Sequence, residues 1–368
     1  MAHRRASDAA KSLLSNASHH LLTPNPLDLP AVGSALDTSL DWWLDQPPAA
    51  VQKRDAFGPT YSESNASALA FKLDPTDQFA PHDQAQIATH AARAVIGADL
   101  GSQALHWFDE RSEPFRAARM PGHSNYGANF ATAVDRHGVM EAAATFGWSY
   151  DMTNEFPQSI GQMAQIALAA LPGLSPFYTT ISCGRRAGGQ QITFEITQDT
   201  SFAALEPLMK AFGLEHRHAG LMTVGAFALG ARYHLPAGSA TITLLRSGQS
   251  VEMRLDINLD ALPDAPTVML PLLRLPMAER PASLSSFDRW LTALTPDGYT
   301  GPGSVTVLSI RTRHDMPARM AVFLRPVAFE KPNTSADTPA PQPTDAAAQE
   351  AAWAQEWGPE QMPHMGVM

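Results

Sequence analysis

The sequence predicts an α+β fold in which about ten antiparallel strands form a closed barrel with helices on its outside. Three observations lead to this prediction. Strand-like segments come in pairs joined by tight turns, which makes the two strands of each pair antiparallel. Helical segments with one apolar face lie between the pairs. The strands alternate apolar and polar residues, and the polar residues carry charges of both signs.

The clearest pair of strands spans residues 239–258, with a tight turn at Ser247-Gly248-Gln249-Ser250. In the second strand, one face carries Val251, Met253, Leu255 and Ile257, and the other carries Glu252, Arg254, Asp256 and Asn258. A period of two means that one face is buried against apolar material while the other meets polar surroundings.

Four further hairpins and six helical segments complete the pattern. The hairpins are expected over residues 61–73, 125–150, 179–197 and 304–329. The helices are expected over residues 81–97, 157–171, 201–212, 221–231, 267–279 and 283–294. A helix–hairpin–helix unit therefore recurs about every 55–65 residues, as a structural rather than a sequence repeat.

The polar face of the sheet decides between two architectures. If helices cover only one side of the sheet, two architectures are possible. The sheet either stays open with its polar face in contact with solvent, or it closes into a barrel with a polar lumen and no free edges. An exposed sheet face usually carries Lys and Glu, whereas this face mixes signs, hydrogen-bonding groups and an aromatic ring. We therefore predict a closed barrel. Its lumen would be lined by Thr193, Glu195, Glu252, Arg254, Asp256, Asn258, Arg319, Phe323 and Arg325.

The chain divides into three parts in this interpretation. Residues 1–24 are small and polar, and we expect a flexible arm. Residues 25–330 form the single barrel domain. Residues 331–368 join a Pro/Ala/Thr-rich linker to an acidic segment with Trp353 and Trp357, and we expect this part to be disordered.

The composition argues against several classes of function. The net charge of −10, from 36 acidic and 26 basic residues, disfavours a nucleic-acid partner. Cys183 is the only cysteine, so neither an internal disulfide nor a cysteine-based metal site can form, which favours the cytoplasm. No signal peptide and no apolar run of roughly 18 residues is present, so we expect no membrane association. The 13 histidines show no metal-ligand spacing.

Successive helix–hairpin–helix units around a ten-strand barrel with a polar lumen resemble the aromatic prenyltransferases, over about residues 55–330. Met253-Arg254-Leu255-Asp256 is similar to the strand on which that family alternates basic residues. Lys72 on the first hairpin fits a basic lumenal position of the family, as do Arg325 on the last strand and either Arg311 or Arg313 on its partner strand. The third hairpin has Gln191, Thr193 and Glu195 where family members often have Lys and Tyr.

The resemblance implies a transferase of secondary metabolism. It would move an allylic prenyl group from a diphosphate donor to an aromatic small molecule or peptide side chain inside the barrel. It also implies a monomer without a resident cofactor, and leaves open a Mg²⁺ ion with the diphosphate. In the family a lumenal carboxylate helps to deprotonate the acceptor, and Glu141, then Glu195, fit that position. The positions that fit substrate binding are Lys72, Thr193, Arg254, Arg311, Arg319, Phe323 and Arg325.

Two other classes of function stay open at this stage. Charged side chains inside any polar barrel must pair, so Arg254 can simply neutralise Glu252, Asp256 or Glu195. The barrel would then bind a small molecule or peptide without chemistry. If the sheet instead stayed open, its polar face would bind a protein partner, with the tryptophan-containing tail as a docking element.

Overall fold

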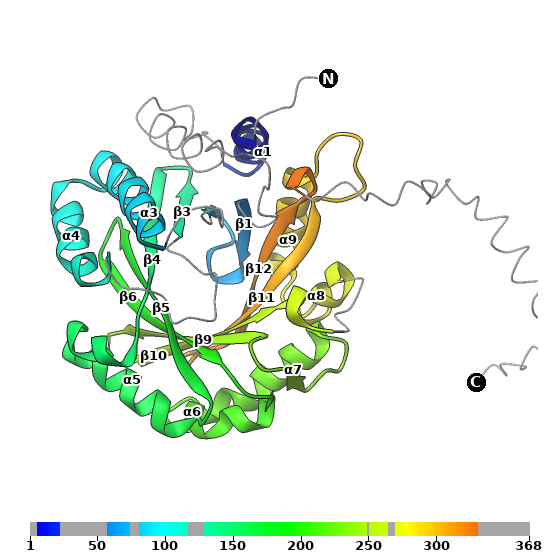
Figure 1. Cartoon of the computed structure of the whole chain (residues 1–368). Coiled ribbons are helices and arrows are strands. Elements are labelled where there is room, and N and C mark those ends of the chain that lie inside the picture. Colours follow the sequence, from blue (N-terminus) through cyan, green and yellow to red (C-terminus); the bar gives the residue numbers. More distant parts are fainter. Residues whose placement is uncertain are drawn as a thin grey trace, which may run out of the picture. The chain divides into compact units, whose positions relative to one another are not determined.

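The computed structural model describes residues 6–22, 57–73, 81–116, 129–248, 250–263 and 269–329. These residues form a closed antiparallel barrel with the strand order β1-β12-β11-β10-β9-β6-β5-β4-β3-β2, and helices lie around its outside (Figure 1). The predicted ten-strand barrel is therefore confirmed. In the described part of the chain, no helix is both long and apolar enough to cross a bilayer.

The barrel strands are β1 (Phe57–Ser62), β2 (Leu69–Leu73), β3 (Phe130–Asp135), β4 (Gly138–Gly147), β5 (Leu174–Gly184), β6 (Gly188–Ile196), β9 (Ala240–Ser247), β10 (Ser250–Asn258), β11 (Gly303–Arg313) and β12 (Met316–Pro326). A separate two-stranded sheet pairs β7 (Thr200–Ser201) with β8 (His234–Leu235). All five predicted hairpins are present, and each contributes two neighbouring strands to the barrel.

The α-helices are α1 (Ala6–Leu21), α3 (Pro81–Val95), α4 (Ser102–Arg116), α5 (Gln158–Ala170), α6 (Glu206–Ala211), α7 (His218–Ala228), α8 (Met269–Met277) and α9 (Pro281–Leu294). They cover the apolar face of the barrel wall. Trp148, the residue directly after β4, shows how this face packs. Its side chain is fully buried, stands edge-on to Phe156 and Phe194, and donates its indole N–H to the Thr193 carbonyl at 3.2 Å.

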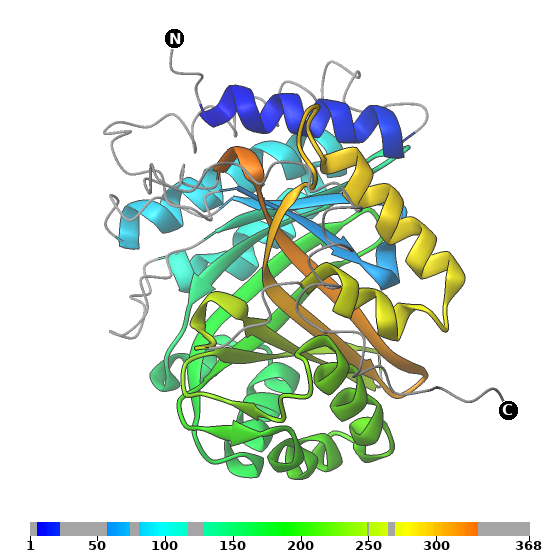
Figure 2. The ribbon, with the colours of Figure 1, turned by 90° about the vertical axis from the view of Figure 1, so that its right-hand side faces the viewer.

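The N-terminal residues differ from the prediction. The expected flexible arm over residues 1–24 contains helix α1, which packs against α9 (Figure 2). Ala10, Leu14 and Ala17 recur at helical spacing and are buried, and Asn16 Nδ2 donates to the Ala293 carbonyl at 3.5 Å. Leu13 and Leu22 are buried with them, so the segment has a continuous apolar face. The predicted disorder of residues 331–368, with Trp353 and Trp357, lies outside the described residues.

The antiparallel order gives the barrel two different ends. The tight turns β1–β2, β3–β4, β5–β6, β9–β10 and β11–β12 all lie at one end, which we call the hairpin end. The longer connections that contain the helices lie at the opposite end, which we call the connection end. In β10 the predicted alternation is confirmed, since Met253, Leu255 and Ile257 are fully buried on the helix-covered face. The opposite face of each strand points into the lumen.

Candidate functional site

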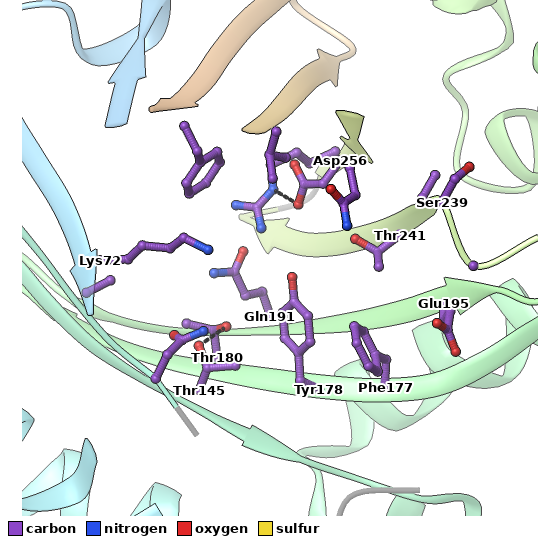
Figure 3. Close-up of a pocket in the computed structure, with 18 residues that line it drawn as sticks. Lys72, Thr145, Phe177, Tyr178, Thr180, Gln191, Glu195, Ser239, Thr241 and Asp256 are labelled. Carbon is purple, nitrogen blue, oxygen red and sulfur yellow. Dashed lines mark hydrogen bonds and ion pairs between the residues drawn. The ribbon is translucent and has the colours of Figure 1, made fainter. Parts of the chain in front are cut away.

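A cavity of about 430 Å³ occupies the lumen on the side of the connection end (Figure 3). Nine of the barrel strands and the residues next to them supply its lining. The lining residues are Lys72, Asn129, Ala131, Thr145, Phe177, Tyr178, Thr180, Gln191, Glu195, Gly238, Ser239, Ala240, Thr241, Arg254, Asp256, Asn258, Val307 and Phe323. The cavity thus combines two cations, two carboxylates, three aromatic rings and several neutral hydrogen-bonding groups.

Arg254 is fixed by two lumenal neighbours. Its Nε donates to Asp256 Oδ2 at 2.9 Å and its Nη2 donates to Thr243 Oγ1 at 3.3 Å. Burial disfavours the charged guanidinium, but Asp256, Tyr178 and Glu252 more than offset this, so the pKa of Arg254 is raised. Arg254 is therefore a permanent cation of the cavity, and the Asp256 carboxylate holds its guanidinium in position.

Strand register explains why these side chains meet. One lumenal residue from each of six neighbouring strands falls in a single cross-strand row, which reads Tyr178, Thr193, Thr243, Arg254, Arg311 and Arg319 from β5 to β12. Directly opposed residues of an antiparallel pair have their side chains in contact range on the same face. The row therefore places a phenol, two hydroxyls and a guanidinium side by side in the lumen wall.

Tyr178 is aimed into the cavity by an irregularity of β5. The pairing of β5 with β6 shifts between Pro176 and Tyr178, so Phe177 and Tyr178 both line the cavity although they are consecutive. Burial raises the pKa of the Tyr178 phenol, and the negative charge of Asp256 raises it further. Arg254, Lys72 and a hydrogen bond with Thr193 act in the opposite direction, and the net shift is upward.

Lys72 and Glu195 lie on opposite sides of the cavity, with Gln191, Tyr178 and Phe177 between them (Figure 3). The Lys72 ammonium lies 5.2 Å from the ring centroid of Phe323 on β12. Glu195 has no hydrogen-bond or ion-pair partner among the residues that the structure describes. The cavity therefore has a cationic side, formed by Lys72 and Arg254, and an acidic side at Glu195.

The barrel matches solved structures of aromatic prenyltransferases in its fold. The 5-dimethylallyltryptophan synthase from Streptomyces coelicolor superposes with a TM-score of 0.64 at 14% identity, over 89% of this chain and 99% of that one. The 6-dimethylallyltryptophan synthase from Micromonospora olivasterospora, in complex with DMASPP and Trp, gives 0.64 at 12% identity, over 87% and 97%. Prenyltransferase PriB, in a ternary complex with L-tryptophan and dimethylallyl thiolodiphosphate, gives 0.60 at 14% identity, over 89% and 98%.

The chain has the aromatic prenyltransferase fold. No protein-family model matches the chain, and no curated protein matches its sequence. At identities of 12–14%, the solved structures establish the fold, and the reaction has to be argued from the cavity.

The cavity contains four of the nine residues predicted for the site, namely Lys72, Glu195, Arg254 and Phe323. Thr193 is fully buried and does not line the cavity, and its hydroxyl lies 2.8 Å from that of Thr243. The other four predicted residues lie elsewhere in the barrel.

Two predicted arginines are held in the hairpin half of the lumen by buried carboxylates. Arg311 forms an ion pair with Glu252, with Nε 2.8 Å from Oε1. Arg319 lies 3.8 Å from Glu63, whose side chain is fully buried. Neither arginine lines the cavity, although the predicted lumenal face is correct for both.

The remaining two predicted residues lie near the barrel ends. Arg325 is buried and pairs with Asp260, beside the connection end. Glu141 is exposed near the hairpin end, three residues after the start of β4, and does not line the cavity. Among the carboxylates proposed to deprotonate an acceptor, the structure therefore brings only Glu195 to the cavity.

Sequence reasoning missed Tyr178, Phe177 and Asn129. The predicted third hairpin starts at residue 179, whereas β5 starts at Leu174, so the aromatic pair was left outside the strand. Two aromatic residues directly before a strand-like segment were the available signal. Within the described ranges, no three His, Cys, Asp or Glu residues gather as a metal-binding group.

Proposed function

We propose that the protein transfers an allylic prenyl group from a diphosphate donor to an aromatic small molecule or peptide side chain inside the barrel. The observation that supports this best is that Lys72 and Arg254 both line a lumenal cavity whose lining also contains three aromatic rings. We further propose that the enzyme acts as a cytoplasmic monomer in secondary metabolism. The single cysteine is consistent with a reducing compartment.

The cationic side of the cavity would hold the donor. An allylic diphosphate carries about three negative charges, and charge-assisted hydrogen bonds to Lys and Arg are the strongest that a protein offers it. When the C–O bond of the donor breaks, its electron pair goes to the diphosphate oxygen. Lys72 and Arg254, with the amide of Gln191 and the phenol of Tyr178, would stabilise that charge in a lumen of low dielectric constant.

The aromatic walls would protect the allylic carbon while it is positively charged. Phe323 already faces the Lys72 ammonium at 5.2 Å, so its ring face accepts a cation. The carbon then forms a bond to the aromatic acceptor, which loses one proton. Glu195 would take up that proton, because it is the lining carboxylate without an internal partner among the described residues.

A second candidate is binding of a small molecule without chemistry. Four charged residues line the cavity, and the charges of Lys72 and Arg254 balance those of Glu195 and Asp256. A lining of zero net charge suits a zwitterionic ligand at least as well as a diphosphate. The third alternative, partner binding on an open polar sheet, loses its basis because the barrel is closed.

Turnover separates the two candidates. The purified protein would be incubated with dimethylallyl or geranyl diphosphate and a panel of indoles, phenols and Tyr- or Trp-containing peptides, with Mg²⁺ or with EDTA. We expect prenylated product by mass spectrometry, and E195Q to lower the rate about 100-fold or more. E206Q, an exposed glutamate at the start of α6, is the matched control and should keep the rate. Binding of an acceptor without product from any pair would favour the non-catalytic candidate.

A further inference from the structure

The charged groups of the cavity are distributed unevenly along its walls. Among the described lining residues the cations are Lys72 and Arg254, which form the cationic side. Arg254 already neutralises Asp256, with 2.9 Å between Nε and Oδ2. The acidic side consists of Glu195, for which the described residues provide neither a hydrogen-bond nor an ion-pair partner. Glu195 is therefore the carboxylate of the lining whose charge is left for a ligand.

Strand register keeps Glu195 apart from the cations. Glu195 on β6 and Asp256 on β10 both lie directly opposite Thr241, on the strand between them. Two strand spacings correspond to roughly 10 Å between the backbones of Glu195 and Asp256. Arg254 lies two residues further towards the hairpin end, and its guanidinium is held by Asp256. Lys72 lies on the opposite side of the cavity (Figure 3).

The groups around Glu195 do not supply a positive charge. The lining residues Ser239, Thr241 and Asn258 are uncharged, and their side chains can hydrogen-bond an anion or a cation equally well. Arg325, near the connection end, is buried, pairs with Asp260 and does not line the cavity. In the described lining, the sign of the charge that this side accepts is therefore decided by Glu195.

A bound donor would strengthen this asymmetry. A diphosphate with about three negative charges, held by Lys72 and Arg254, would engage both cations of the lining. The rest of the cavity would then lie between the diphosphate and Glu195, which are both negative. A second anion placed there would meet like charges on two sides, and such juxtapositions are what exclude wrong partners from a binding site.

We infer that Glu195 selects the charge of the acceptor, so that the cavity takes aromatic amines and rejects aromatic compounds with a free carboxylate. Phe177 lies next to Glu195 in the cavity wall (Figure 3), and the face of an aromatic ring attracts a cation. This role is compatible with uptake of the ring proton, because the charge of Glu195 acts through space without direct contact with the ammonium group. The inference rests on the proposed function in taking diphosphate as the occupant of the cationic side.

Calorimetric titration of three indoles of similar size tests the inference. Tryptamine carries an ammonium group, 3-propylindole is neutral, and indole-3-propionate carries a carboxylate. Each is titrated into protein saturated with inorganic diphosphate, which occupies the cationic side and allows no chemistry. We expect tryptamine to bind at least about tenfold more tightly than indole-3-propionate, with 3-propylindole between them.

E195Q is the decisive variant. Gln keeps the size and the oxygen acceptor of Glu195 and removes its charge, so the preference for tryptamine over indole-3-propionate should fall by about threefold or more. E206Q, in the exposed start of α6, is the matched control and should keep the full preference. Loss of a proton acceptor alone would lower the rate of turnover and leave this binding preference unchanged.

A titration without diphosphate checks that the cationic side was correctly assigned. Indole-3-propionate should then bind more tightly than in the presence of diphosphate, because nothing competes with its carboxylate for Lys72 and Arg254. The affinity of 3-propylindole, which has no charge, should change much less.

The outcomes distinguish charge selection from the proposed function. Equal affinities for tryptamine and indole-3-propionate, or a preference that folded E195Q retains in full, would overturn charge selection and leave prenyl transfer standing. Failure of all three indoles to bind would overturn it as well. The expected preference together with no product from any donor and acceptor would leave charge selection standing and overturn prenyl transfer.

Discussion

Replacing Asp256 with Asn tests whether this carboxylate weakens the attraction of Arg254 for an anionic ligand. Asp256 accepts from Arg254 Nε at 2.9 Å and is 8% exposed. Asn is nearly isosteric and keeps an oxygen acceptor for Nε, so the guanidinium should stay in place. The substitution removes one negative charge from a lining that is formally neutral, and we expect D256N to bind diphosphate more tightly than the wild type.

The size of the effect follows from the geometry. An anion on the far edge of the guanidinium lies roughly 7 Å from the carboxylate, and two unit charges at that distance interact by about 2 kcal/mol at an effective dielectric constant of about 20. Removing this repulsion for a single unit of ligand charge corresponds to at least a tenfold gain in affinity. The fold itself should lose roughly 1–3 kcal/mol, because Arg254 no longer has a charged partner.

The assay is calorimetric titration of inorganic diphosphate into wild type, D256N and the control D315N at constant ionic strength. Asp315 is an exposed residue in the β11–β12 turn, where its side chain is 61% exposed. D315N should bind like the wild type. Unchanged or weaker binding by folded D256N would refute the view that Arg254 is the cation that faces the ligand.

Three further predictions concern groups outside the cavity. R311M should destabilise the protein by about 3 kcal/mol in urea unfolding, because it leaves the buried Glu252 carboxylate without its cation; R311M/E252Q should recover part of this. The hydrogen bond from Arg185 lowers the pKa of Asp135, so this pair stabilises the fold above a pH of about 4 and loses its effect as pH falls through the lower folded pKa. R185M should thus cost at most about 1 kcal/mol at neutral pH, and thermal melts of the two proteins should converge as the pH falls below about 4. Burial raises the pKa of Cys183 to about 11, so a thiol reagent at pH 8 should modify the unfolded protein much faster than the folded one.

The barrel could be predicted from the sequence because its signal is local. Alternation in a strand and a tight turn between two strands depend on neighbouring residues, and they repeat along the chain. The mixed charges of the polar face, such as Arg254 beside Asp256, then favoured closure over an open sheet. Helices α1 and α4 were missed; the apolar stripe of α4 is sparse, since only Phe108, Ser112 and Phe115 are buried.

The site could be predicted only in part, because pairing inside a barrel depends on register between strands far apart in sequence. Alternation placed Arg311 and Arg254 correctly on the lumenal face. It could not show that Glu252 would bind Arg311 while Asp256 would bind Arg254. The shift in β5 that turns Tyr178 into the cavity is likewise a property of pairing with β6, and the alternation pattern does not contain it.

Binding of dimethylallyl thiolodiphosphate, compared between wild type, K72M and K210M, tests the central claim most directly. Met keeps the length of the lysine stem and removes the charge, and Lys210 is an exposed residue of α6 that serves as the matched control. The proposed donor site predicts that K72M loses at least tenfold in affinity while K210M binds like the wild type. Equal affinity in all three folded proteins would contradict a donor site on the cationic side of the cavity.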